Sequence, residues 1–290
     1  MLDFPQALRI PLASWVDAGM RWVLRNLGPL FDTIGHVVLQ MLLVVEQVLL
    51  FIPWFVFIPA VAALAWKALR SVRSSVVFAL LLFAIGTFGY WQLAMNTLAI
   101  VVSAVLISLI IGIPVGILMA WSDRMQTVMK PVLDAMQTLP SFVYLIPALM
   151  LFGLGKVPAT FATIIYAVPP VIRLTNVGIR EVPRDVIEAA RAYGANRRGI
   201  LLDVQLPLAR PSILVGINQT TMMALAMVVI GSMIGARTLG MEVLLAINRV
   251  NIGQGVEAGV SIVIMAIVID RITYAFAHTR RRSPGESTGT

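Results

Sequence analysis

The chain has 290 residues, of which 59% are hydrophobic and only 12% are charged. Soluble domains usually hold about 45–50% apolar and about 25% charged residues, and one globular core of this length cannot bury the excess. The composition therefore excludes an ordinary soluble enzyme and predicts an all-α polytopic membrane protein, whose apolar helices are solvated by lipid. The net charge of +8 is then expected to orient the loops in the membrane, and no nucleic-acid binding is expected.

The N-terminal region, residues 1–47, is predicted to lie at the membrane surface. Within 11–36, apolar side chains recur at helical spacing on one face and charged ones on another, and Trp15 and Trp22 suit a membrane–water interface. We expect an interfacial helix here, and a helix packed on a partner chain is the alternative. The stretch 37–50 contains Gln and Glu residues and is expected to be a further re-entrant or interfacial segment.

Seven apolar stretches have about the 20 residues that are needed to cross a bilayer. The expected spans are 48–66, 75–95, 97–121, 136–153, 158–179, 211–234 and 256–275. The first two, in 48–95, are expected to be peripheral, whereas 96–275 forms the core and 276–290 a tail. Gly112 and Gly116 form a Gly-x-x-x-Gly pair that permits close helix packing but is also frequent by chance.

The basic residues predict how the chain is oriented. Most Lys and Arg residues fall on one set of loops, which holds 122–135, 180–210 and the C-terminus. The positive-inside rule places these loops in the cytoplasm, and with seven spans the N-terminus is then outside. No ionisable side chain lies clearly at the middle of a span, which counts modestly against a carrier driven by an ion gradient.

The long loop 180–210 carries the clearest pattern. Pro183 suits the first position of a helix, and Gly194 permits a tight turn into a second short helix. Ala189, Ala190 and Gly194 are small residues, which let another backbone approach closely. Two interpretations remain: a helix that docks a soluble partner, and a helix folded against its own bundle.

Here the residues resemble a known family. Glu188-Ala189-Ala190, then Gly194, then Leu206-Pro207 resembles the EAA signature of ABC importer permeases. Longer strings resemble the permeases of glycine betaine/proline betaine/choline-type osmoprotectant importers. These strings are 136–147, 168–175, 216–229 and 270–273. The similarity covers roughly 95–275, and it is weaker back to about residue 12.

The resemblance implies a type I ABC importer permease core that works as a homodimer in a bacterial-type inner membrane. It implies that the EAA loop is the coupling helix, which docks on a separate ATP-binding subunit that holds the ATP and Mg²⁺. The residues implied in this coupling are Glu188, Ala189, Ala190, Gly194, Leu206 and Pro207. It also implies an external substrate-binding protein or domain, and glycine betaine or a related osmolyte as substrate. Choline, carnitine or an amino acid are the alternatives.

One departure from the family pattern lies at Arg237 and Thr238, where small residues are usual. This position falls in an outer loop, where the substrate-binding partner is expected. The departure leaves the substrate open and does not affect the expected fold.

Several kinds of chemistry are not expected in this chain. It has no Cys, only two His that lie far apart, and no Gly-x-x-x-x-Gly-Lys-Ser/Thr loop. We therefore expect no catalysis, no metal site and no cofactor in this chain, and energy must come from a separate ATPase or an ion gradient. A self-sufficient secondary carrier and a non-transporting membrane anchor remain as alternative functions.

Polar residues in the sixth span suggest where a substrate passes. They are Asn218, Gln219, Thr220 and Thr221, followed by Met222. Polar side chains at that depth need partners or water. The pattern predicts either the lining of a translocation path or hydrogen bonds between helices, which are as common.

Overall fold

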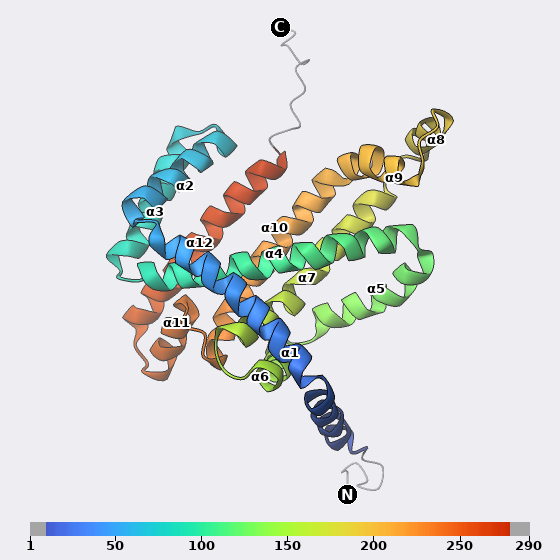
Figure 1. Cartoon of the computed structure of the whole chain (residues 1–290). Helices are drawn as coiled ribbons and strands as arrows, with labels where there is room; N and C mark the ends of the chain where they lie inside the picture. The colour runs from blue at the N-terminus through green and yellow to red at the C-terminus, as the bar shows by residue number, and fades with distance from the viewer. Residues whose placement is uncertain (1–9, 279–290) are drawn as a thin grey trace, which may run out of the picture.

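The structure, a computed structural model, describes residues 10–278, with side chains through residue 275. The regular elements of this part are all helical (Figure 1). The long and medium α-helices are α1 Leu12–Phe51, α2 Trp54–Leu69, α3 Val72–Thr87, α4 Trp91–Trp121, α5 Asp123–Thr138, α6 Leu145–Phe152, α7 Lys156–Arg180, α8 Arg184–Ala192, α10 Leu206–Gly231, α11 Leu239–Asn248 and α12 Ile252–His278. Shorter elements are η2 Ser141–Tyr144, α9 Arg197–Gly199, the π-helical η3 Ile200–Gln205 and η4 Ser232–Ile234. Most of the expected tail at 276–290 lies outside the described residues.

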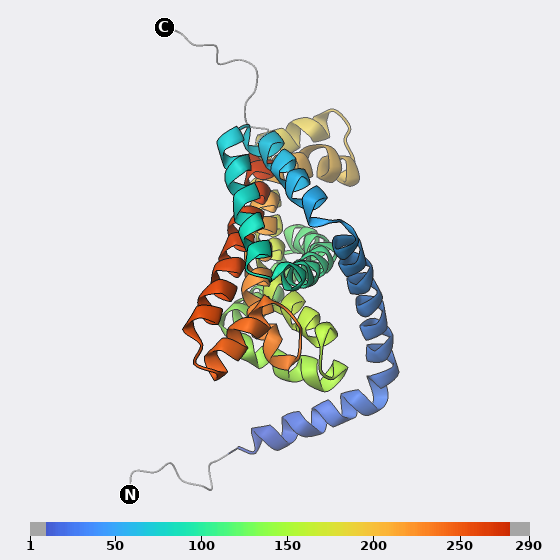
Figure 2. The same cartoon turned by 90° about the vertical axis from the view of Figure 1, so that its left-hand side faces the viewer.

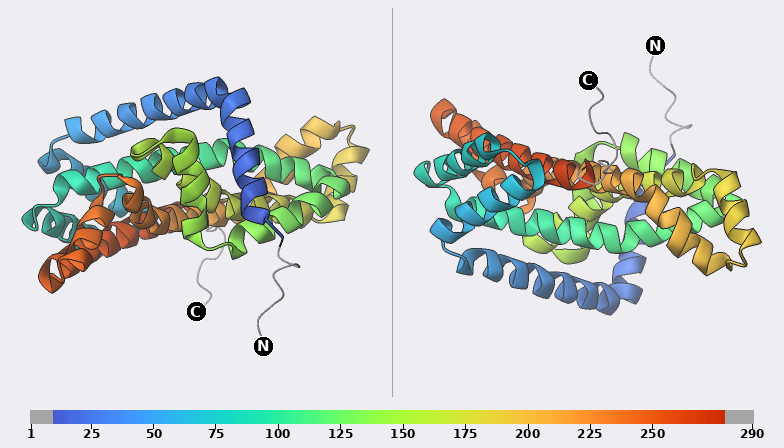
Figure 3. Two further views of the ribbon diagram at one scale, coloured as in Figure 1. Left: turned by 90° about the horizontal axis from the view of Figure 1, so that it is seen from below. Right: turned by 90° about the horizontal axis from the view of Figure 1, so that it is seen from above.

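Helix α7 is the centre of the bundle. It packs along α4 on one side and α10 on the other, and Figure 3 shows these helices aligned side by side from above and below. Small residues allow the close approach: Gly112 and Gly116 of α4 face α7, and Gly216 of α10 faces it from the other side. The Gly-x-x-x-Gly pair in α4 is therefore a true packing motif.

The bundle has two ends, which we name by the helices they carry. The α8 end carries α8, α9 and η3, together with the end of α4 and the beginning of α5 (Figure 1). The α11 end carries α11, the short η4 before it and the turn between α6 and α7. The Gly155 N–H of this turn donates to the Ile234 carbonyl of η4 at 2.9 Å.

The first two expected spans differ from the helices that form. The expected span 48–66 is interrupted because α1 ends at Phe51 and α2 begins only after Pro53. The residue before a proline is driven out of the helical conformation. The expected span 75–95 is interrupted by a turn at Gly89, whose φ of +80° favours glycine. Helices α2 and α3 have 16 residues each and pack as a hairpin against α12.

Helix α1 joins the two N-terminal segments that the sequence separated. The stretch 37–50 is neither re-entrant nor separate, because it continues the same 40-residue helix. Pro29 lies inside the helix, and Figure 2 shows a sharp bend before the helix reaches the bundle. The first part lies apart from the bundle with Trp15 and Trp22 exposed, which suits the expected interfacial helix.

The second part of α1 packs against α4, α6 and the beginning of α7. Leu42 is fully buried in the core beside Ile100, and Phe31 packs edge-on against Phe152 with ring centroids 6.1 Å apart. Glu46 forms an ion pair with Lys156 at 2.6 Å. This arrangement ties α1 to the turn between α6 and α7.

The chain is a multi-pass membrane protein. Among the described residues, five helical stretches are long and apolar enough to cross a bilayer, where seven were expected. They are α1, α4, α7, the stretch 197–234 and α12. A sixth would be α5 followed by the η2–α6 segment, which meet at a bend of 108°. The expected span 136–153 is interrupted at Leu139 and Pro140, which separate the end of helix α5 from the η2–α6 segment.

Candidate functional site

Helix α8 projects from the end of the bundle (Figures 1 and 2). None of its residues is buried, and Tyr193, which follows its last residue, is 94% exposed. The helix rests on η3 and does not fold back against the membrane-spanning helices. The structure thus does not show the helix folded against its own bundle, and docking on a soluble partner stays a prediction.

The turn after α8 has a fixed shape. Gly194 adopts φ +84°, its N–H donates to the Arg191 carbonyl at 2.9 Å, and the Ala195 N–H donates to the Ala190 carbonyl at 3.0 Å. This pair of bonds is a Schellman motif, which uses a left-handed residue to satisfy the last carbonyls of a helix. The tight turn expected at Gly194 is present, and it sets the angle at which α8 leaves the bundle.

The two faces of α8 differ in exposure. Ile187 and Ala190 are half-buried, whereas Glu188 and Ala189 are exposed. Val186, Ala189 and Tyr193 share one exposed apolar face at i, i+3 and i+7, which we call the α8 stripe. These three side chains leave an apolar face of the projecting helix in contact with solvent in the single chain.

The base of the projecting loop is clasped by Arg180, the last residue of α7. Its guanidinium forms an ion pair with Asp123 at 2.8 Å and donates to the Met119 carbonyl at 2.9 Å and to the Asn176 side chain at 3.1 Å. The end of α7 is thereby joined to the end of α4 and the beginning of α5. The sequence showed Arg180 only as one more basic loop residue, because nothing in its spacing predicts partners some 60 positions away.

Leu206 and Pro207 lie apart from α8, where η3 passes into α10. Leu206 packs on the small apolar cluster around Ile179 and Leu201, and Pro207 is exposed in the first turn of α10. The six expected coupling residues therefore form two groups. One group is on the projecting helix and its turn, and the other is at the junction that leads into the membrane.

The five expected path residues also separate into two groups. The Asn218 amide donates to Asp270 on α12 at 3.0 Å, Thr220 is fully buried, and the Thr221 hydroxyl bonds within its own helix at 2.8 Å. In the single chain these three side chains are bonded or buried, and the buried Thr220 hydroxyl has no hydrogen-bond partner among the described residues. Gln219 and Met222 are exposed on one face of α10, so only these two remain candidates for a path lining in the single chain.

The exposed face around Gln219 is unusual for a membrane helix. Val215, Gln219 and Met222 lie at i, i+4 and i+7, and Gln219 is at the middle of α10. An amide exposed to hydrocarbon is costly because lipid offers it no hydrogen bonds. This face of α10 is therefore expected to meet water or another protein chain.

Helix α5 presents a second polar face that the sequence analysis missed. Lys130, Asp134 and Gln137 are exposed at i, i+4 and i+7, and Asp134 pairs with Arg173 of α7 at 2.7 Å. Both partners of the pair remain about half exposed, at 55% and 40%. The helical spacing is present in the sequence, but 122–135 was assigned to a loop, so no polar helix face was predicted there.

At the α11 end, the loop before α11 separates the two residues that depart from the family pattern. Thr238 is fully buried at the beginning of α11, whereas Arg237 is exposed. The Arg237 carbonyl accepts from Asn96 at 3.4 Å, and the Leu239 N–H donates to Thr97 at 3.0 Å. Arg237 is thus held at the surface by two bonds between its loop and α4.

Comparisons with known proteins agree on one family. Residues 112–281 match the family model described as "Binding-protein-dependent transport system inner membrane component". The "Glycine betaine/proline betaine transport system permease protein ProW" of Escherichia coli (strain K12) is 48% identical over 94% of this chain and 77% of that protein. The "Glycine betaine transport system permease protein OpuAB" of Bacillus subtilis (strain 168) is 44% identical over 91% of this chain and 94% of that protein.

A solved structure is similar in fold. It is the MetNI methionine ABC transporter in an inward-facing conformation, which matches with a TM-score of 0.59 and 22% identity. The match covers 64% of this chain and 94% of that one. At this identity the likeness concerns the fold alone.

Proposed function

The chain belongs to the binding-protein-dependent transport system inner membrane components, with the fold of a type I ABC importer permease, and we propose that it imports glycine betaine or a closely related quaternary-ammonium osmolyte. The substrate is proposed from the two relatives, which are named for glycine betaine and share 48% and 44% of their residues with this chain. Membership of this family favours an ATP-driven importer over the self-sufficient carrier and the membrane anchor.

We propose that the α8 stripe docks on a separate ATP-binding subunit, which holds the ATP and Mg²⁺. The observation that carries this proposal is the projecting helix itself, with Tyr193 and Val186 exposed. Aromatic side chains that enter a pocket on a partner commonly dominate the energy of such interfaces. Glu188 and Ala189 lie on the exposed side of the same helix and complete the docking surface.

Two connections carry motion from α8 into the membrane. The first is the Arg180 clasp, which joins α7 to α4 and α5. The second is the continuous passage through η3 into α10, with Leu206 packed at the junction. When the ATPase subunits approach each other, the rigid turn at Gly194 transmits their displacement, and the packed helices tilt as a unit.

The path is proposed to lie between two copies of this chain. Gln219 and Met222 on α10 and the Asp134–Arg173 pair on α5 and α7 are the groups that a single chain leaves exposed. If these groups face a second copy across a water-filled space, they are not exposed to lipid, and the free-energy cost of placing polar groups in hydrocarbon is avoided. A path with both charges and amides also suits a zwitterionic substrate, which needs partners for each of its charges.

The α8 end is proposed to face the cytoplasm of a bacterial-type inner membrane, where ATP is available. This orientation places the C-terminus inside, as the distribution of basic residues indicates. The α11 end then faces outward, and exposed Arg237 lies where an external substrate-binding protein delivers its cargo.

The path and the orientation are tested together by cysteine labelling, because the chain has no native Cys. A Gln219→Cys variant should react with a membrane-impermeant maleimide, since the thiolate forms only in contact with water. In vesicles that hold this chain without the ATP-binding subunit, a Tyr193→Cys variant should react completely, and only when the reagent is on the cytoplasmic side. The modified fraction is measured by mass spectrometry in oriented vesicles.

The matched control is Ile110→Cys, at an exposed apolar position of α4 that is expected to face lipid and to stay unlabelled. If Gln219→Cys is as unreactive as Ile110→Cys, the path does not follow this face of α10. If Tyr193→Cys is labelled only from the outer side, the proposed orientation is wrong.

A further inference from the structure

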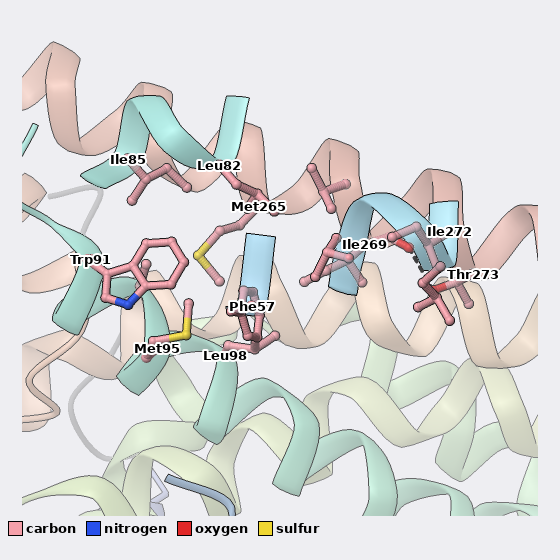
Figure 4. A pocket seen from close by; sticks show the side chains of 14 residues that line it. Phe57, Leu82, Ile85, Trp91, Met95, Leu98, Met265, Ile269, Ile272 and Thr273 are labelled. Atoms are coloured by element: carbon pink, nitrogen blue, oxygen red, sulfur yellow. Dashed lines mark hydrogen bonds between the residues drawn. The ribbon is translucent and has the colours of Figure 1, made fainter. Parts of the chain in front are cut away.

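A cavity of about 200 Å³ lies between α2, α3, α4 and α12 (Figure 4). Phe57, Trp91, Met95 and Met265 are among the side chains that line it, and nearly all of the others are aliphatic. The hydroxyl of Thr273 also reaches the wall, but it donates to the Ile269 carbonyl at 2.7 Å. The cavity is therefore an apolar space that offers little to a polar ligand.

If an apolar space of this size is empty, the side chains that line it lose dispersion contacts. Water is a poor occupant because the walls give it no hydrogen bonds. Leu64, which lines the cavity, is 43% exposed on the surface of the α2–α3 hairpin. The cavity thus adjoins the membrane-facing surface, where the available solvent is acyl chains.

The lining residues of α2 lead toward a positively charged surface. Phe57, Val61 and Leu64 lie at i, i+4 and i+7, and Lys67 is one turn further along the same face. Arg70 follows in the hairpin turn and Arg73 in the first turn of α3, and both are exposed. No acidic residue occurs between positions 54 and 87, so this tip is positive without compensation from its own helices.

Helix α12 adds a further cation at the same end of the cavity. Arg271 precedes the lining residue Ile272, and its side chain is 63% exposed. The neighbouring carboxylate, Asp270, accepts a hydrogen bond from Asn218 at 3.0 Å and lies 4.0 Å from Arg271. Arg271 is therefore paired with a carboxylate, and the net positive charge near the cavity comes from the hairpin tip.

We propose that this cavity binds one acyl chain of an anionic phospholipid, whose phosphate is held by Lys67 and Arg70. The acyl chain fills the space between the hairpin and α12, and the headgroup lies at the hairpin tip. The bound lipid fastens the hairpin to the bundle, where α2 and α3, at 16 residues each, are short for a bilayer. This site is separate from the α8 stripe and the path.

The first test fills the cavity. Val61→Phe places a ring into the space, and Val77→Phe makes the same change on α3 at an exposed position outside the lining. Each full-length variant is purified in mild detergent and its retained phosphatidylglycerol is counted by native mass spectrometry. Retention by Val61→Phe should fall about tenfold relative to Val77→Phe, because burial of the acyl chain drives lipid binding. Equal retention by the two variants overturns the proposal.

The second test concerns the headgroup and includes an experiment on the unmodified chain. The double variant Lys67→Gln, Arg70→Gln should lose its preference for phosphatidylglycerol over phosphatidylcholine, whereas Lys130→Gln on α5 should keep it. In the unmodified chain, phosphatidylglycerol with a photoactivatable acyl chain should label peptides from 57–64 and 265–273. Labelling spread evenly over the membrane helices, or a preference that survives the double substitution, rejects the site.

Discussion

Replacing Gly194 with valine should lower ATP-driven uptake about tenfold or more, with membrane insertion unchanged. Its backbone has φ +84°, where a β-branched residue costs roughly 1–2 kcal/mol, and about 1.4 kcal/mol corresponds to a factor of ten. No atom beyond the neighbouring residues lies within 4 Å of a Cβ built there. The loss therefore comes from a changed exit angle of α8, and not from a clash inside the chain.

The effect of this substitution is measured as uptake into vesicles and as the amount of ATPase subunit that co-purifies. Gly86→Val is the matched control, because it adds the same side chain to a glycine on ordinary helical backbone of α3, away from α8, where no atom lies within 4 Å of a built Cβ. Both readouts should fall for Gly194→Val and stay near normal for the control. Unchanged uptake and complex formation in Gly194→Val contradict the coupling role of α8.

Replacing Gly116 with leucine should strongly destabilise the bundle. A Cβ at this position would lie 2.6 Å from the Thr175 Cβ and 2.7 Å from the Ile172 carbonyl oxygen, and backbone atoms of α7 cannot yield without separating the helices. We expect a loss of about 3 kcal/mol or more, at the upper end for overpacking. Thermal unfolding in detergent, with the yield of monodisperse protein, measures this loss.

Gly86→Leu is the control for overpacking, because no atom lies within 4 Å of a Cβ built at that position of α3. It should unfold close to the temperature of the unmodified chain. If Gly116→Leu is as stable as Gly86→Leu, α4 and α7 do not pack as closely as the structure has them.

The sequence predicted the core of the fold better than its periphery. Long apolar runs identify α4, α7, α10 and α12 because each is nearly continuous between charged loops. Hydropathy alone did not resolve the N-terminal third, where breaks at Pro53 and Gly89 leave α2 and α3 with 16 residues each, short for a bilayer. Hydropathy averaged over a window is little changed by a single residue that breaks a helix. Each of the two expected spans therefore included a break.

In the candidate site, too, features with a local sequence signal were predicted and features that depend on distant contacts were not. The turn at Gly194 was predictable because its signal is local: a glycine after a helical pattern. Asn218 and Gln219 could not be told apart, because the partner of Asn218 is Asp270, 52 positions later. The same holds for the Arg180 clasp and the Asp134–Arg173 pair. Contacts distant in sequence decide which polar residues are used in packing and which remain available for function.

Reconstituted transport tests the central claim most directly. The chain is placed in liposomes with its ATP-binding subunit and its external binding protein, and radiolabelled glycine betaine is supplied on the side of the α11 end. Uptake should require ATP on the side of the α8 end, and it should disappear when the ATPase subunit is left out. Uptake that persists in liposomes with this chain alone, driven by an ion gradient and indifferent to ATP, would contradict the claim.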